Sequence, residues 1–382
     1  MHPRWNEDSR PRGAAGPDEG SDGAAGPAVH ALGEAGARAA FLGRLAGEAV
    51  DPAGLLERAA AGPGTGPLGA LPEATPGPAG LWTCEIPVTA PSGVLPSAAP
   101  GAVTVSGHGG DARTARLAAL LTALAVHGTL AAVPHARPGR EVWGLDLVTG
   151  GLRRIPADEA HPAPAHGTTF RPVPGAAAGL TWEAAVETAL VRHCEELVTH
   201  RLAEPGVRVP RLALPADGGT FLRALRRLGE PVAHDLSALL PVPACAVRLR
   251  AGGGTAVGVG ATRAEAVAAA VERAVTLNAG AGAGDGRGGP AVPAVSAVSA
   301  VSAVSAVSAV SAVSAVSAVS AVTPEQEVSG PPVPVERGES GRAGLVEVLR
   351  ARGRTPVAVL LDHDPRAGRL LPYIVRVVLQ DS

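Results

Sequence analysis

The sequence contains no lysine, and all 33 of its basic residues are therefore arginine. A Walker A phosphate loop, a pyridoxal Schiff base, lysine-based aldolase chemistry and protein-kinase catalysis all need lysine, so these classes are excluded. Aromatic residues are also scarce, with four Trp, three Phe and one Tyr in 382 residues. This scarcity counts against a stacking platform for single-stranded nucleic acid.

Cysteine is almost as rare. Cys84, Cys194 and Cys245 lie far apart without a CxxC pair, so the sequence encodes neither a zinc cage nor a disulfide framework. The net charge is −2 and the arginines are dispersed, which gives no basic stripe for nucleic acid. No apolar segment follows Met1, and no unbroken run of 18 apolar residues predicts a membrane helix. We therefore expect a cytoplasmic, reduced protein that binds neither nucleic acid nor membrane.

Glycine and proline, by contrast, are abundant (50 and 36 residues) and gather in biased tracts. Residues 1–30 lack any periodicity and are predicted to be a disordered tail, followed by a helical and loop region over 31–102. Residues 103–278 and 343–382 are predicted to form two parts of one domain. The segment 279–342 between them is of low complexity and includes nine uninterrupted Ala-Val-Ser triplets from Ala294 to Ser320. A period of three fits neither helix nor strand, so we interpret it as replication slippage in a tolerated linker.

The best-defined element is an amphipathic helix that begins at Trp182. Thr181 has the chemistry of an N-cap, and the apolar residues after it follow the three-and-four spacing of one helix face. The charged residues fall largely off this stripe: Glu183, Glu187, Arg192, Glu195 and Glu196.

The remaining pattern alternates strands and helices, which predicts an α/β (α+β) fold. Helices are predicted within 31–60 (restarting at Asp51-Pro52) and over 111–128, 220–228, 262–277 and 345–352. Strands are predicted at 81–88, from 103, at 207–214, 232–236, 244–249, from 256, at 356–361 and 373–379, with a hairpin over 142–155. Residues 156–168 are predicted to be a loop and 362–368 a turn. A strand and a glycine turn precede the helix that is predicted to start at Asp111. The same order precedes the helix that is predicted to start at the capping box of Thr262.

Several of these pieces stand in the order seen in YcaO-domain proteins: Val105–Gly109 with its helix, Val142–Gly150, Gly175–Thr199, Gly258–Thr276 and Tyr373–Val378. From Val103 onward, outside the linker, the chain resembles this family, which includes the azoline-forming cyclodehydratases of thiazole/oxazole-modified peptide and thiopeptide pathways. The resemblance implies a YcaO-like α/β fold that binds ATP and Mg²⁺ without a P-loop. It also implies an activity in which ATP activates a backbone amide so that Cys, Ser or Thr closes an azoline ring.

The resemblance assigns site residues one by one. It implies nucleotide binding by Ser106, His108, Arg192, Arg263, Glu272 and Arg273, and metal binding by Glu195 or Glu196. His108 replaces the lysine of the family's Ser-Gly-Lys-Gly loop. The acidic pair of the family's first helix corresponds to Thr122 and Ala125, neither of which can ligate Mg²⁺ with charge.

Each of these motifs also has a structural interpretation. Ser106 and His108 fit an ordinary strand-to-helix turn, and Glu195 and Glu196 fit a solvated helix face with Arg192 and His200 as neighbours. Capping alone explains Thr262, Arg263 and Glu265. His193 and Cys194 are predicted to be packed, and Asp362-His363-Asp364 to be loop.

Three hypotheses for function follow. The first is ATP-dependent cyclodehydration on a precursor peptide, beside a leader-peptide-binding partner protein and compatible with a homodimer. The second is a catalytically degenerate YcaO-like scaffold that presents the substrate in the same kind of pathway. The third is an unrelated α/β binding domain.

Overall fold

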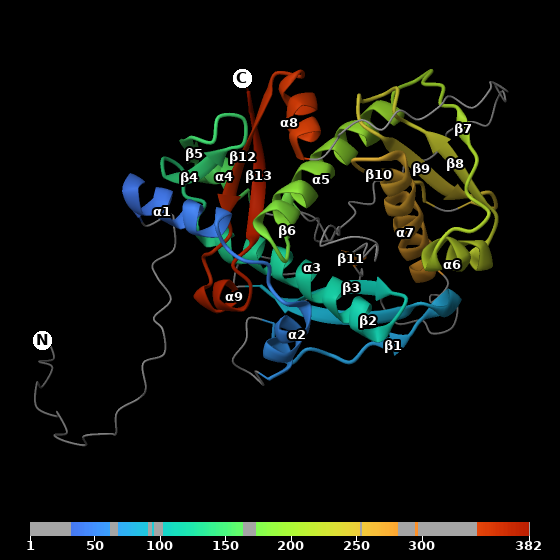
Figure 1. The fold of residues 1–382 in the computed structure, drawn as a ribbon, viewed down its shortest axis with the longest axis horizontal. Coiled ribbons are helices and arrows are strands. Elements are labelled where there is room, and N and C mark those ends of the chain that lie inside the picture. Colours follow the sequence, from blue (N-terminus) through green and yellow to red (C-terminus); the bar gives the residue numbers. More distant parts are fainter. Residues whose placement is uncertain are drawn as a thin grey trace, which may run out of the picture.

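The computed structural model describes residues 32–61, 68–90, 94, 102–162, 173–252, 254–281, 295–296 and 342–381. The predicted tail and most of the predicted linker lie outside these residues. The described chain forms three sheets with helices packed against them, which confirms the predicted α/β (α+β) class (Figure 1).

The first sheet has the order β1-β2-β3-β11. It consists of β1 (Thr75–Pro76), β2 (Trp82–Thr89), β3 (Ala102–Gly109) and β11 (Val295–Ser296), and only β11 runs parallel to its neighbour. The long helix α3 (Ala112–Ala132) packs on β2 and β3, and α2 (Pro52–Ala60) contacts α3. Asp51 caps α2 and Asp111 caps α3, as their sequences predict.

The central sheet has the order β5-β4-β12-β13-β6. Its strands are β4 (Glu141–Asp146), β5 (Leu152–Pro156), β6 (Ala176–Ala178), β12 (Arg354–Leu360) and β13 (Ile374–Asp381), all antiparallel to their neighbours. The strands after the predicted linker thus fill the middle of this sheet. Helices α1 (Glu34–Leu45) and α8 (Arg342–Arg350) contact it, and α9 (Pro365–Leu370) lies in the β12–β13 connection.

The third sheet has the order β10-β9-β8-β7. It contains β7 (Arg211–Leu212), β8 (Pro231–Asp235), β9 (Ala244–Leu249) and β10 (Ala256–Val259), with α6 (Thr220–Leu228) and α7 (Arg263–Ala281) packed together beside it. The helix predicted from Thr181 is α5 (Trp182–Leu202). It lies between the central and third sheets and contacts both β13 and β10 (Figure 1).

Three strand-to-helix units depend on glycine, but not because of a turn. A Cβ on Gly107 would lie 2.1 Å from a backbone nitrogen of α3, and one on Gly179 would lie 2.4 Å from a backbone nitrogen of α5. Gly258 is equally close to the backbone of α7, at 2.4 Å. None of the three has a positive φ. These glycines are therefore required because each strand end lies directly against the helix that follows it.

Helix α3 forms the centre of one hydrophobic core. By length and composition, Ala112–His135 could cross a membrane, but 83% of its most apolar stretch is buried inside the protein. Packing between the first sheet and β6 accounts for this apolar character.

Three local predictions are wrong. The predicted strand 207–214 pairs only at Arg211 and Leu212, because prolines interrupt it on both sides. The predicted turn 362–368 contains α9, which Asp364 caps and Pro365 begins. The predicted loop 156–168 starts with a short helix, α4 (Ala157–Ala160).

Candidate functional site

Ser106 and His108 lie inside β3 and not in a turn at the start of α3. Their side chains are buried, at 4% and 7% exposed, and His108 Nδ1 lies 3.1 Å from Thr83 Oγ1 on β2. Burial lowers the pKa of His108 to about 4, so its imidazole is neutral at neutral pH. A neutral, buried histidine does not supply the positive charge that a phosphate-binding lysine would. The interpretation of this segment as a strand-to-helix turn is also wrong, since the turn is Gly110–Asp111.

Four of the predicted site residues do come together, between α5 and α7. Arg192 and Glu195 project from α5, and Glu272 and Arg273 project from α7. The guanidinium of Arg273 forms an ion pair with the carboxylate of Glu195, and these side chains are only 5% and 12% exposed. We refer to Arg192, Glu195, Glu272 and Arg273 as the charge cluster.

The ion pair is anchored on the outer edge of β10. Glu195 accepts a hydrogen bond from the backbone N–H of Val259, and Arg273 donates to the carbonyl of Val257. On its other side β10 pairs with β9. Among the described residues β10 is the last strand of its sheet. The two side chains therefore satisfy backbone groups that a further strand would otherwise pair with.

Burial shapes the electrostatics of the charge cluster. It raises the pKa of Glu195, an effect that the charge of Arg273 opposes, and it lowers the pKa of Arg192 to about 9. Burial also raises the pKa of Glu272 well above its ordinary value; this side chain is 1% exposed, and its Oε1 has no hydrogen-bond partner in the described part of the chain. Two guanidinium groups therefore face one well-compensated carboxylate and one carboxyl group that favours its protonated form.

The other predicted residues have different surroundings. Glu196 is exposed on α5, outside the charge cluster. The Glu195 side chain is largely buried, so the interpretation of this segment as a solvated helix face is wrong for Glu195. Arg263 forms an ion pair with Asp235 at the end of β8. Glu265 accepts from the backbone N–H groups of Ala261 and Thr262, while its own N–H donates to Thr262 Oγ1. This reciprocal arrangement confirms the predicted capping box.

The residues present do not fit a bound Mg²⁺–nucleotide complex. Mg²⁺ prefers carboxylate oxygens, but Thr122 and Ala125 are buried in the middle of α3, where the Thr122 hydroxyl donates to the Ala118 carbonyl. The carboxylate of Glu195 is engaged by Arg273 and the Val259 amide. Within the described residues, no group of three His, Cys, Asp or Glu side chains could hold a metal ion.

The residues predicted to be structural are packed. Cys194 is fully buried, and the Nε2 of His193 donates to the Val377 carbonyl at 2.8 Å. Asp364 pairs with His127 and Asp362 with Arg44, while the ring of His363 contacts two further histidines. Asp362-His363-Asp364 therefore joins distant segments. This role cannot be predicted from the sequence because the partners are far apart in the chain.

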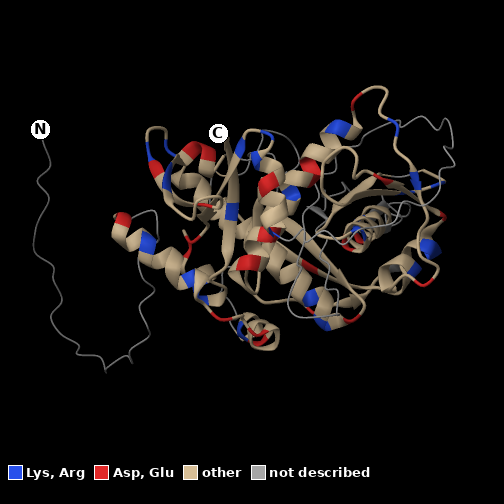
Figure 2. Cartoon of the chain, turned by 45° about the horizontal axis from the view of Figure 1, so that its top comes forward, with Lys and Arg blue, Asp and Glu red and all other residues tan. Residues whose placement is uncertain are grey.

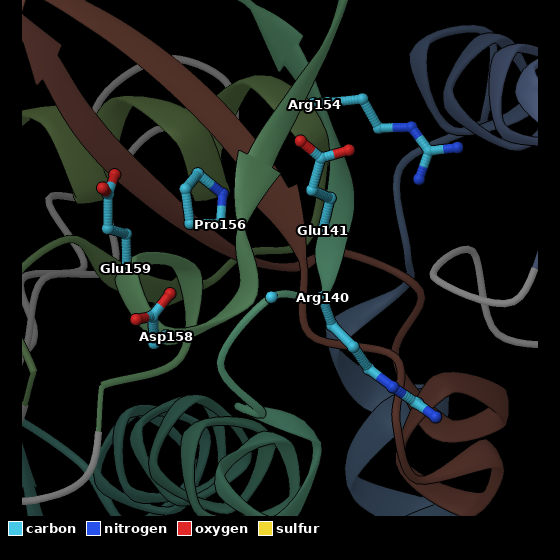
Figure 3. Close-up of a pocket in the computed structure, with 7 residues that line it drawn as sticks. Arg140, Glu141, Arg154, Pro156, Asp158 and Glu159 are labelled. Atoms are coloured by element: carbon cyan, nitrogen blue, oxygen red, sulfur yellow. The ribbon is translucent and has the colours of Figure 1, made fainter.

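Charged residues outside the charge cluster are of both signs. Positions of arginine and of acidic residues are interspersed over the ribbon (Figure 2). A depression of about 600 Å³ at the β4–β5 hairpin is lined by charges of both signs, with Arg140 and Arg154 directed away from Asp158 and Glu159 (Figure 3). Arg154 lies over the ring of Trp143 at 3.8 Å. The depression and these contacts belong to the β4–β5 hairpin at the surface.

No family model and no curated protein matches this chain. Solved structures do match, including two with a TM-score above 0.5. The YcaO protein from Methanopyrus kandleri, bound with AMPPCP and Mg²⁺, is 15% identical with a TM-score of 0.52 over 81% of this chain and 85% of its own. A heterocyclase in complex with substrate and cofactor is 12% identical with a TM-score of 0.55 over 86% of this chain. This chain spans about half of that heterocyclase, 52% of its length. The chain therefore has a YcaO-like fold.

Proposed function

We propose that this chain works in the maturation of ribosomally synthesised peptides as a YcaO-like subunit that does not turn over Mg²⁺-ATP itself. In this role it holds the precursor peptide, or a leader-peptide-binding partner protein, for a catalytic cyclodehydratase. The observation that carries the proposal is the state of Glu195: this carboxylate is bound by Arg273 and a backbone amide, and the acidic pair of α3 is absent.

Similarity to a heterocyclase that was solved with its substrate supports a peptide as the ligand class. The YcaO-like fold supports a role in peptide maturation, while the chemistry of the charge cluster argues against turnover of Mg²⁺-ATP by this chain. Phosphoryl chemistry depends almost wholly on positioning and on compensation of phosphate charge by metal ions and cations. A chain without the carboxylates that hold the metal can keep the peptide-binding surfaces of the fold, but it cannot compensate the phosphate charge in this way.

The test is reconstitution with a candidate precursor peptide and a catalytic cyclodehydratase. We expect that the purified chain alone consumes no ATP, and that adding it to the cyclodehydratase raises the rate of ring formation, seen by mass spectrometry as loss of one water per ring. A rate that is unchanged by the chain, together with no binding to peptide or partner, would contradict the proposal.

The alternative is ATP-dependent azoline formation by this chain. The observation that favours it is the second buried carboxyl of the charge cluster, Glu272, whose Oε1 has no partner among the described residues. If this alternative holds, the chain alone forms rings from ATP and precursor, and Glu272→Gln abolishes them. The same reconstitution therefore separates the two functions.

A further inference from the structure

The Glu195 carboxylate in the charge cluster is buried and therefore needs compensating positive charge. A carboxylate that is only 12% exposed must be compensated, because an isolated buried ion costs far more than a folded protein can tolerate. Metal ions, cationic side chains and backbone N–H donors can each provide this compensation. For Glu195 the described partner is Arg273, from a different helix and far away in the sequence.

The Glu195–Arg273 pair also hydrogen-bonds backbone groups at the edge of the third sheet. Val257 and Val259 are two residues apart on β10, so their outward backbone groups point to the same side. Arg273 covers the carbonyl of the first and Glu195 the N–H of the second. The pair thereby links α5, α7 and the edge of β10.

We infer that Arg273 is the resident cation of this site: its guanidinium neutralises Glu195 in place of a divalent metal and, together with Glu195, closes the edge of the third sheet. The site therefore takes no divalent cation in the wild-type protein. Removing the guanidinium leaves the buried Glu195 carboxylate without its cation, and carboxylate oxygens are the ligands that Mg²⁺ and Mn²⁺ prefer. The inference concerns the site behind the proposed function, but its test measures stability and metal binding only.

The experiment compares thermal unfolding of wild type, Arg273→Ala and the double variant Glu195→Gln/Arg273→Met, each with millimolar MgCl₂ or MnCl₂ and with NaCl at the same ionic strength. We expect Arg273→Ala to lower Tm by roughly 10 °C because a buried carboxylate loses its partner. Mg²⁺ or Mn²⁺ should restore several degrees of this loss. Wild type should not respond.

The double variant keeps the experiment decisive if Arg273→Ala does not fold. It carries no charge at either position, so we expect it to unfold within a few degrees of wild type and to ignore the metals. A metal-dependent rise in wild-type Tm, or Mn²⁺ binding to wild type in isothermal titration, would overturn the inference. So would an Arg273→Ala protein that folds but gains nothing from either metal. Because none of these measurements involves a peptide, failure of the inference is distinct from failure of the proposed function.

Discussion

At the scale of single residues, burial decides which groups keep their ordinary chemistry. Cys84, Cys194 and Cys245 are all buried and free, and burial raises the pKa of their thiols to about 11, 12 and 12. His108 and His193 change in the other direction, because burial lowers the pKa of both to about 4. These residues therefore act as packed, neutral side chains and not as nucleophiles or bases.

The thiols allow a direct prediction. A thiol that is buried and held in its protonated form reacts slowly with a disulfide reagent, since the thiolate is the reactive species. We expect no rapid reaction of the native protein with Ellman's reagent at neutral pH, and reaction of all three cysteines after denaturation. One fast equivalent in the native protein would mean that a cysteine lies in a reactive environment.

The histidines predict a pH dependence of stability. Their pKa is lower in the folded than in the unfolded state, so the unfolded state binds more protons between about pH 6.5 and 4, and stability falls as the pH falls through this range. At pH 5 the loss is about 2 kcal/mol for each fully buried histidine. Glu272 acts in the opposite sense, because its raised pKa means that protonation at lower pH stabilises the fold.

The variant His193→Gln isolates the histidine contribution, since Glu272 is common to both proteins. Glutamine can still donate to the Val377 carbonyl but does not titrate. Urea unfolding at pH 7 and pH 5 should show a loss of stability on acidification that is smaller in the variant by about 2 kcal/mol. Equal losses in the two proteins would show that His193 is not responsible.

At the scale of elements, local chemistry predicts the starts of helices well. Helix starts at Asp51 and Asp111 and caps at Thr181 and Thr262 are all predicted from the sequence, because a helix start depends on a few neighbouring residues. The surroundings of Ser106 and Glu195 could not be predicted in this way. Ser106 is buried by tertiary packing, and the partner of Glu195 lies on another helix, so neither has a signal within its own segment.

The close contact between β3 and α3 gives an element-scale prediction. Gly107→Ala should destabilise the protein by about 3 kcal/mol, because its Cβ would overlap backbone atoms of α3, which cannot move aside as a flexible side chain could. The matched control is Gly110→Ala, whose Cβ would meet nothing nearer than 3.5 Å. The two free energies of unfolding, measured with denaturant, should differ clearly. Similar values would refute the close-packing account of these strand–helix units.

At the scale of the whole molecule, the chain combines a YcaO-like fold with a buried carboxylate, Glu195, that is paired with Arg273. Strands β12 and β13, which follow the Ala-Val-Ser tract in the sequence, form the middle of the central sheet, so the C-terminal part is integral to the fold. The order of motifs predicts this fold. It does not reveal the surroundings of Glu195: Thr122 and Ala125 are visible in the sequence, whereas the pairing of Arg273 with Glu195 requires the structure.

The measurement that tests the central claim most directly is isothermal titration of the wild-type protein with Mg²⁺ and the nonhydrolysable ATP analogue AMPPCP. We predict no saturable heat, because the Glu195 carboxylate is neutralised by Arg273 and α3 offers no carboxylate. Saturable binding in the micromolar range that depends on Mg²⁺ and disappears in Glu195→Gln would contradict this account.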